Sequence, residues 1–438
     1  MALSRLVYRF AAVFFTCFTL LLFPGCDSDS GNTVTPPDSF RAVVVGSGTI
    51  SNDGTDYPYQ LLRLEFDGKE PSYAQWFPHP DGKDAPAVML TDPYGQITWN
   101  GDVLPEGADE RTPEAVFLDA NIYLINGFSA LNVFGRYYAG GDIRNEVDDM
   151  VAGLRFLAQA PRVMRDRIAV YGGSWGGFES VYASAHAPEG AVPRVGVALY
   201  PVSDFQEFMH YLTVDIPLIE NEEKRNQYIN FFAPFVERIN AGTGGDYSRW
   251  TRAYLLSRLR TPYLVLHDQW DTLIPYQHSK DLADQSAGMV RGIWFLKGSA
   301  ADLNALPYGY GHGDLQLKDG GGTQYSMPMY LTLSLAYLLK ELALPEQIII
   351  NGYDPDALDD FVAYLKTYKD GAEYDMEWAA PRLLDLADAR VYLVNMDDPD
   401  DVITGAEAVA GAINAAWGTS LTMDTVRGAL ANGLPPYE

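Results

Sequence analysis

One twelve-residue stretch, Arg167–Phe178, restricts the possible folds of this chain more than any other. Its first five residues, RIAVY, are mostly apolar and end at glycines, which is typical of a short buried strand. The next five, GGSWG, place Ser174 in a G-x-S-x-G pattern, and a helix is expected from there to about Ala187. Strand, sharp turn and helix form the setting of a nucleophile elbow. The stretch therefore predicts a catalytic serine, with a glycine-rich turn and an incidental serine as the alternative.

The glycines of this pattern carry a prediction of their own. A nucleophile elbow strains the backbone of its serine and brings the strand close to the helix that follows. Side chains at Gly172 and Gly176 would then collide with the neighbouring strand and helix. We expect both positions to lack room for a β-carbon.

The rest of the chain predicts a mixed α/β architecture. Turn residues at 46–48, 52–54 and 67–68 separate the first strands, which favours an antiparallel opening. Later strands alternate with helical segments at 145–160 and 177–187, which favours a mostly parallel central sheet flanked by helices. The expected strands lie near residues 41–45, 60–66, 73–77, 87–90, 121–126, 195–199, 262–267 and 292–296.

A serine nucleophile needs a general base, and the base needs an acid that orients it. The strand at 262–267 runs into a turn that contains Asp268 and Asp271, and we favour Asp271 as the acid. Of the six histidines, His312 alone lies in a glycine-rich loop after a later strand, which makes it the candidate base. His267, at the strand end, is expected to be structural. A surface role for His312 is the alternative.

These motifs together resemble the catalytic domain of the prolyl-oligopeptidase family of serine hydrolases. GGSWGG around Ser174, HDQWDTLIP at 267–275 and the pair Gly311-His312 occur in the order of that family. The resemblance covers residues 85–342. It implies an α/β-hydrolase fold and a Ser174–Asp271–His312 triad that works through an acyl-enzyme, with no metal or organic cofactor.

The resemblance also implies an oxyanion site. The backbone N–H of Trp175 would be one donor, and the hydroxyl of Tyr94 the other, since Tyr94-Gly95 follows a strand as the oxyanion tyrosine of that family does. Pro93-Tyr94 is similar to the cocaine-esterase and X-Pro dipeptidyl-peptidase group. Asp268 replaces the family's usual glycine and Trp175 its usual tyrosine. The expected substrate is a peptide or, alternatively, a carboxylic ester; a non-catalytic, lipid-tethered binding protein on a hydrolase scaffold is a third interpretation.

The first 39 residues predict export. A basic start precedes an apolar run at 10–23, which is shorter than the roughly 20 residues that span a bilayer. Residues 1–26 therefore predict a signal peptide, with a single-pass anchor as the alternative. Its end, LFPGC, resembles a bacterial lipoprotein signal, in which Cys26 would be lipidated, and residues 27–39 predict a flexible tether. The expected location is the cell envelope, or otherwise outside the cell.

Charge and cysteine content restrict the partners. A formal net charge of −27 argues against nucleic acid, because phosphate binding calls for a basic surface, and against an anionic membrane surface. The only membrane contact expected is through the possible N-terminal lipid. Cys17 and Cys26 are the only cysteines, so the chain beyond residue 26 can form neither a disulfide nor a cysteine metal site.

The sequence after the tether divides into two parts. Residues 40–344 predict the hydrolase domain, with an aromatic, mostly helical insert at 203–258 that either caps the site or packs as ordinary core. Residues 345–438 carry 18 acidic and 5 basic residues and predict a mainly helical appendage with a single strand at 390–396. The acidic run at 397–401 lacks the glycine and glutamate spacing of a calcium loop, so no metal is expected there.

Overall fold

The computed structural model describes residues 40–96 except 53 and 67, residues 109–294 except 138, residues 303–312, and short pieces between 334 and 422. The predicted signal, the tether and Cys26 lie outside these residues. Within the described part of the chain, no helix is long and apolar enough to span a membrane.

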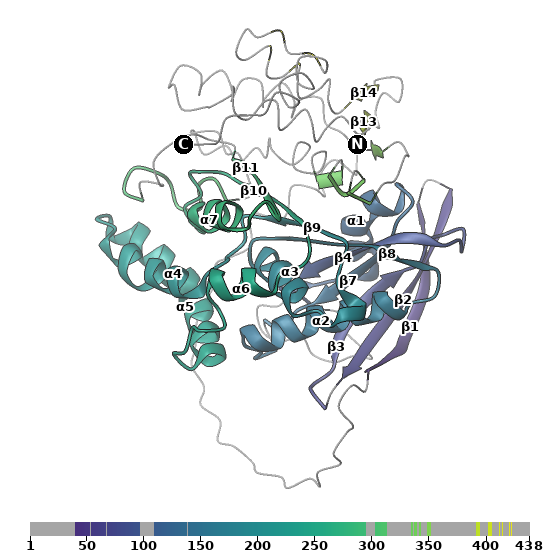
Figure 1. Ribbon diagram of the computed structural model, residues 1–438, viewed down its shortest axis with the longest axis horizontal. Helices are drawn as coiled ribbons and strands as arrows, with labels where there is room; N and C mark the ends of the chain where they lie inside the picture. The colour runs from purple at the N-terminus through teal and green to yellow at the C-terminus, as the bar shows by residue number, and fades with distance from the viewer. Residues whose placement is uncertain are drawn as a thin grey trace, which may run out of the picture. The chain divides into compact units, whose positions relative to one another are not determined.

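A nine-stranded sheet is the centre of the fold, and helices flank it (Figure 1). Its first strands pair antiparallel and the remainder pair parallel, as predicted. Parallel strands such as β9 and β10 are buried along their whole length, which is expected where helices cover both faces. In spatial order the strands are β1 (Phe40–Asn52), β2 (Thr55–Phe66), β3 (Ser72–Phe77), β7 (Ser129–Phe134), β4 (Ala85–Asp92), β8 (Val163–Gly173), β9 (Val195–Leu199), β10 (Tyr263–His267) and β11 (Val290–Trp294).

The helices connect these strands. A capping box starts α2: the Asp142 side chain accepts from the backbone N–H of Asn145, and the Asn145 side chain accepts from that of Asp142. The insert between β9 and β10 is helical, as predicted. In chain order the helices are α1 (Pro113–Leu124), α2 (Ile143–Gln159), α3 (Trp175–His186), η2 (Glu189–Ala191), α4 (Phe205–His210), η3 (Tyr211–Asp215), η4 (Ile216–Leu218), α5 (Glu222–Thr243), α6 (Arg252–Arg258) and α7 (Gln277–Gln285).

The prediction of a strand at 121–126 was wrong. These residues form the end of helix α1 and the turn after it, and strand β7 begins only at Ser129. The helix is specified upstream: the Thr112 side chain accepts from the backbone N–H of Ala115, and Pro113 occupies the first turn. The apolar run NIYLI belongs to a helical period that started eight residues earlier.

The turn predicted at 46–48 was also wrong. Strand β1 continues through these residues with a register shift between Val44 and Gly46, and the hairpin turns at Gly54, which has a φ of 77°. Gly48 lies opposite Tyr59 in the register, and a β-carbon there would come within 2.6 Å of the Tyr59 ring. The glycine makes room for a neighbouring aromatic ring and does not end the strand.

In the C-terminal part, the strand predicted at 390–396 is not alone. β13 (Val391–Val394) pairs parallel with β12 (Ile348–Asn351) and antiparallel with β14 (Val402–Thr404). These partners are only four and three residues long, too short for a periodic signal. Most of the helical sequence predicted for this part lies outside the described residues. Elsewhere in the chain, two short strands, β5 (Gly95–Gln96) and β6 (Asp109–Glu110), form a separate parallel pair.

Candidate active site

Ser174 stands at the turn between β8 and α3, in a backbone conformation that few side-chain-bearing residues adopt. Its φ of 57° and ψ of −124° are the strained geometry expected of a nucleophile elbow. A β-carbon on Gly172 would lie 2.3 Å from the carbonyl oxygen of Gly176 and 2.3 Å from Thr91 Oγ1. The predicted crowding at both glycines is therefore confirmed. The Thr91 hydroxyl ties the turn to β4 by donating to the Gly176 carbonyl at 2.9 Å.

The structure brings His312 and Asp271 to this serine. Ser174 Oγ lies 2.7 Å from His312 Nε2, and His312 Nδ1 lies 2.8 Å from Asp271 Oδ2. Asp271 is buried in the loop after β10, where its Oδ1 accepts from the backbone N–H groups of Leu273 and Ile274. Ser174 and His312 are 138 residues apart in the sequence, yet together with Asp271 they form one hydrogen-bonded chain.

The electrostatics of the site keep Asp271 ionised. Burial alone would raise its pKa, but the charge of His312 and hydrogen bonds from His267 and His312 hold that pKa far below the usual carboxyl value. An ionised Asp271 can orient the imidazole of His312 and stabilise its cation.

Asp268, the alternative acid, lies apart from His312. Its Oδ1 accepts from the backbone N–H of Trp270 at 2.9 Å, and its Oδ2 has no hydrogen-bond partner among the described residues. Burial raises the pKa of Asp268 well above that of an ordinary carboxyl, and the nearby charge of Asp271 adds to the effect. Asp268 therefore fixes the loop through its bond to Trp270, and among the described residues no hydrogen bond joins it to His312.

The two predicted oxyanion donors occupy different elements. Trp175 is the first residue of α3, where a backbone N–H has no acceptor within its own helix. Its buried indole donates to Glu146 Oε2 at 2.5 Å and packs edge-on against the rings of Phe178 and Phe235. Tyr94 lies just past β4, half-buried, with its ring 5.1 Å from that of Tyr137.

Glu146, which accepts the hydrogen bond of the Trp175 indole, has an unusual environment for a carboxyl group. Its carboxyl is fully buried, and burial raises its pKa to about 8, although the Trp175 hydrogen bond and the Arg238 charge oppose that rise. In the unfolded chain the same carboxyl titrates near pH 4.5. The folded protein therefore keeps a proton that the unfolded chain releases, and the stability that this neutral form provides is lost as pH rises from about 4.5 to about 8.

We expect Glu146→Gln to remove this pH dependence. Glutamine keeps an acceptor for the Trp175 indole and carries no charge, so its melting temperature relative to wild type should be more favourable at pH 8 than at pH 5. Thermal unfolding of both proteins across pH 5 to 8 measures this. Glu237→Gln on α5, where the carboxylate is exposed, is the control. A constant difference between Glu146→Gln and wild type across this range would contradict the expectation.

The structure adds a residue that sequence reasoning missed. Tyr200 directly follows β9, has a φ of 37°, and places its ring 4.6 Å from the ring of His312. A strained backbone beside the candidate base is typical of a functional site. The sequence signal that could have identified Tyr200 is its position at the carboxyl end of a central parallel strand, where functional groups collect.

Two families match the part of the chain that contains Ser174, and one of these matches extends past Asp271, whereas His312 lies outside both. Residues 141–296 match the prolyl oligopeptidase family, and residues 67–214 match the X-Pro dipeptidyl-peptidase (S15) family. These two matches indicate a serine hydrolase that is similar to both families within residues 67–296. The fold of this hydrolase is that of the α/β-hydrolases. No curated protein matches its sequence.

Solved structures similar to this hydrolase include a puromycin hydrolase, a puromycin-hydrolyzing peptidase and an acetyl xylan esterase. A puromycin hydrolase is 17% identical with a TM-score of 0.44, over 66% of this chain and 46% of that one. A puromycin-hydrolyzing peptidase of Mycobacterium tuberculosis is 18% identical with a TM-score of 0.44, over 65% and 39%. Acetyl xylan esterase 1 from Thermoanaerobacterium sp. JW/SL YS485 is 16% identical with a TM-score of 0.43, over 70% and 89%. The match with this hydrolase thus spans less than half of either puromycin-hydrolysing chain.

Proposed function

We propose that this hydrolase is a prolyl-oligopeptidase-type serine peptidase that cleaves peptides through Ser174, His312 and Asp271. The observation that carries the proposal is the continuous chain from Ser174 Oγ through His312 to Asp271 Oδ2, built on a strained elbow. This arrangement suits a nucleophile, its general base and the acid that orients the base.

In the proposed mechanism, His312 Nε2 takes the proton of Ser174 as the hydroxyl oxygen attacks the substrate carbonyl. The resulting oxyanion accepts from the backbone N–H of Trp175 and from the hydroxyl of Tyr94, and each such donor is worth roughly 3 to 4 kcal/mol in the transition state. His312 then gives the proton to the leaving amine. The amine departs, and the acyl group stays on Ser174 as an acyl-enzyme. Water, activated by His312, releases the acid product and restores Ser174.

Ester hydrolysis is the second candidate, because the same groups cleave esters. Apolar rings lie beside the loop that carries His312: the ring centroids of Phe231 of α5 and Tyr308 are 6.0 Å apart, and Phe231 is 38% exposed. Such rings favour an apolar acyl group or side chain. Other aromatic residues of the insert are buried in ring contacts, Phe205 with Trp250 and Phe232 with Phe208, which is ordinary core packing.

A substrate panel separates the two candidates. We expect aminoacyl- and prolyl-p-nitroanilides to give kcat/KM values above those of p-nitrophenyl esters, after the intrinsic reactivity of each leaving group is accounted for. Turnover of esters alone would favour the carboxylesterase. Absence of turnover across the panel would favour a non-catalytic binding protein.

We also propose that the protein is exported and lipidated at Cys26. The basic start, the apolar run and the polar segment at 27–39 support this. Mass spectrometry of the mature protein should find an N-terminal peptide that begins at a lipid-modified Cys26, and Cys26→Ser should lack the lipid. An intact Met1 terminus on the mature protein would rule out this processing.

A further inference from the structure

A second histidine, His267, contacts the same carboxylate oxygen of Asp271 as the proposed base does. Asp271 Oδ2 lies 2.8 Å from His312 Nδ1 and 3.1 Å from His267 Nε2. His267 is the last residue of β10, is fully buried, and has no contact with Ser174 among the hydrogen bonds of the site. We propose that His267, held in turn by Ser279, is a positioning residue that fixes Asp271 for its contact with His312. This inference rests on the proposed triad.

The surroundings of His267 determine which ring nitrogen carries the proton. Nε2 lies within hydrogen-bond distance of two acceptors, Asp271 Oδ2 and the carbonyl oxygen of Ile274 at 3.0 Å. In the neutral ring Nε2 therefore carries the hydrogen and Nδ1 is an acceptor. The hydroxyl of Ser279, 2.8 Å from Nδ1, is positioned to donate to it. Ser279 thus favours the tautomer in which His267 donates to Asp271.

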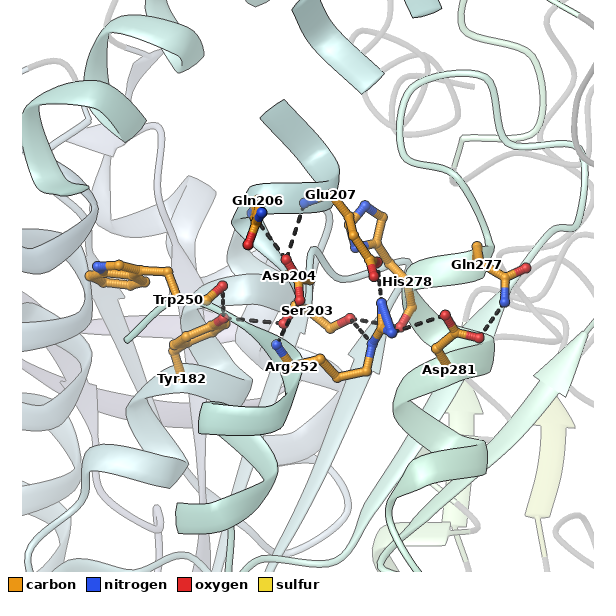
Figure 2. Close-up of polar contacts among 10 residues, drawn as sticks. All are labelled: Tyr182, Ser203, Asp204, Gln206, Glu207, Trp250, Arg252, Gln277, His278 and Asp281. Carbon is orange, nitrogen blue, oxygen red and sulfur yellow. Dashed lines mark hydrogen bonds and ion pairs between the residues drawn. The ribbon is translucent and has the colours of Figure 1, made fainter. Parts of the chain in front are cut away.

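Ser279 belongs to α7, and the helical insert holds this helix in place. Arg252 of α6 reaches between Glu207 of α4 and Asp281 of α7, with 2.9 Å between its Nη1 and Asp281 Oδ2 (Figure 2). The Ser203 hydroxyl donates to the carbonyl of His278, one residue before Ser279, at 2.7 Å. The Arg252 side chain is almost fully buried. Ser279 therefore stands on a helix that is fixed on both sides of it.

These contacts make one chain: Ser279, His267, Asp271, His312 and Ser174. The Asp271 carboxylate has its Oδ1 fixed by backbone N–H groups, so the donor on Oδ2 decides whether that oxygen stays aimed at His312. Loss of the His267 donor should misplace the carboxylate, and a displacement of 1 Å near a reacting centre can cost about 100-fold in rate. It should also leave Asp271 more basic, so that His312 holds its proton to higher pH.

The test measures kcat and the pH dependence of kcat/KM on p-nitrophenyl acetate for wild type, His267→Leu, His267→Gln and Ser279→Ala. We expect His267→Leu to lower kcat by about 10- to 100-fold, the range that such a misplacement allows, and to move the acidic limb of kcat/KM to higher pH. His267→Gln keeps an N–H near the Nε2 position and should restore most of both properties. Ser279→Ala should shift the limb in the same direction by less.

Two controls separate positioning from loss of structure. Ser286→Ala removes a buried hydroxyl at the end of the same helix, where it contacts only the backbone at Ala283 and Val290 in this structure, and should keep the wild-type limb. The other titratable groups near the pair are unchanged in every variant: Asp268, His278, Tyr200, Tyr211 and Tyr228. If His267→Leu does not fold, Ser279→Ala against Ser286→Ala decides the question.

Proton NMR of the resting protein provides a readout that does not depend on turnover. The low-field resonance of the His312 Nδ1 proton, assigned by its loss in His312→Ala, should move in Ser279→Ala and stay in Ser286→Ala. Wild-type kcat, acidic limb and resonance in both Ser279→Ala and His267→Leu would overturn the positioning role. Equal turnover by wild type and Ser174→Ala would instead overturn the proposed function, and the resonance would still report on His267.

Discussion

Ser174→Ala should abolish turnover. Removal of the nucleophile from a serine hydrolase of this kind costs roughly 10⁶-fold in kcat, because no other group can form the acyl-enzyme. The residual rate should exceed the uncatalysed rate by the contribution of the oxyanion donors and of substrate binding, about 10³- to 10⁴-fold. Steady-state kinetics on the best substrate of the panel measures this.

The variant should fold as the wild type does. The backbone of Ser174 is strained, and alanine adopts a φ of 57° at a similar cost in free energy. The melting temperature should therefore change little. Ser180→Ala, which removes a buried hydroxyl from the same helix, is the matched control and should keep its activity. Wild-type turnover by Ser174→Ala would show that another residue is the nucleophile.

Asp271→Asn should give the second largest loss, on the order of 10⁴-fold in kcat. The amide is nearly isosteric with the carboxylate, so the geometry should survive. An asparagine that donates its N–H to His312 Nδ1 would, however, stabilise the tautomer that cannot accept the Ser174 proton, and the same substitution has an effect of this order in another serine hydrolase.

Asp268→Asn is the matched control for this loss. Both aspartates are fully buried in the same loop, but burial raises the pKa of Asp268 well above the usual carboxyl value, whereas the pKa of Asp271 is held below it. Asparagine also keeps an oxygen for the backbone N–H of Trp270. We expect kcat within a few-fold of wild type. A larger loss for Asp268→Asn than for Asp271→Asn would reverse the assignment of the acid.

The parts of the site that the sequence predicted well are those set by local rules. The glycines around Ser174 are required by contacts within a single turn, and the strand and helix beside them are continuous in sequence. His312 and Asp271 were found because each follows a recognisable strand. Their distances could not be predicted, since they depend on how the loops fold over the sheet.

The features that the sequence did not reveal depend on distant partners. Tyr200 gains its place from packing against His312, more than a hundred residues later in the chain. His267 lies at the end of its strand, as expected, but its contact with Ser279 depends on how α7 packs against β10. The strand predicted at 121–126 failed for a different reason, because the helix signal at Thr112 and Pro113 lay upstream of the apolar run.

The central claim is that Ser174 is the nucleophile, and covalent labelling tests it most directly. Wild-type protein treated with a fluorophosphonate probe and digested should carry the adduct on the peptide that contains Ser174, and Ser174→Ala should carry none. Because the probe reacts only with an activated serine, the result does not depend on knowing the substrate. An adduct on a different residue, or equal labelling of Ser174→Ala, would contradict the account.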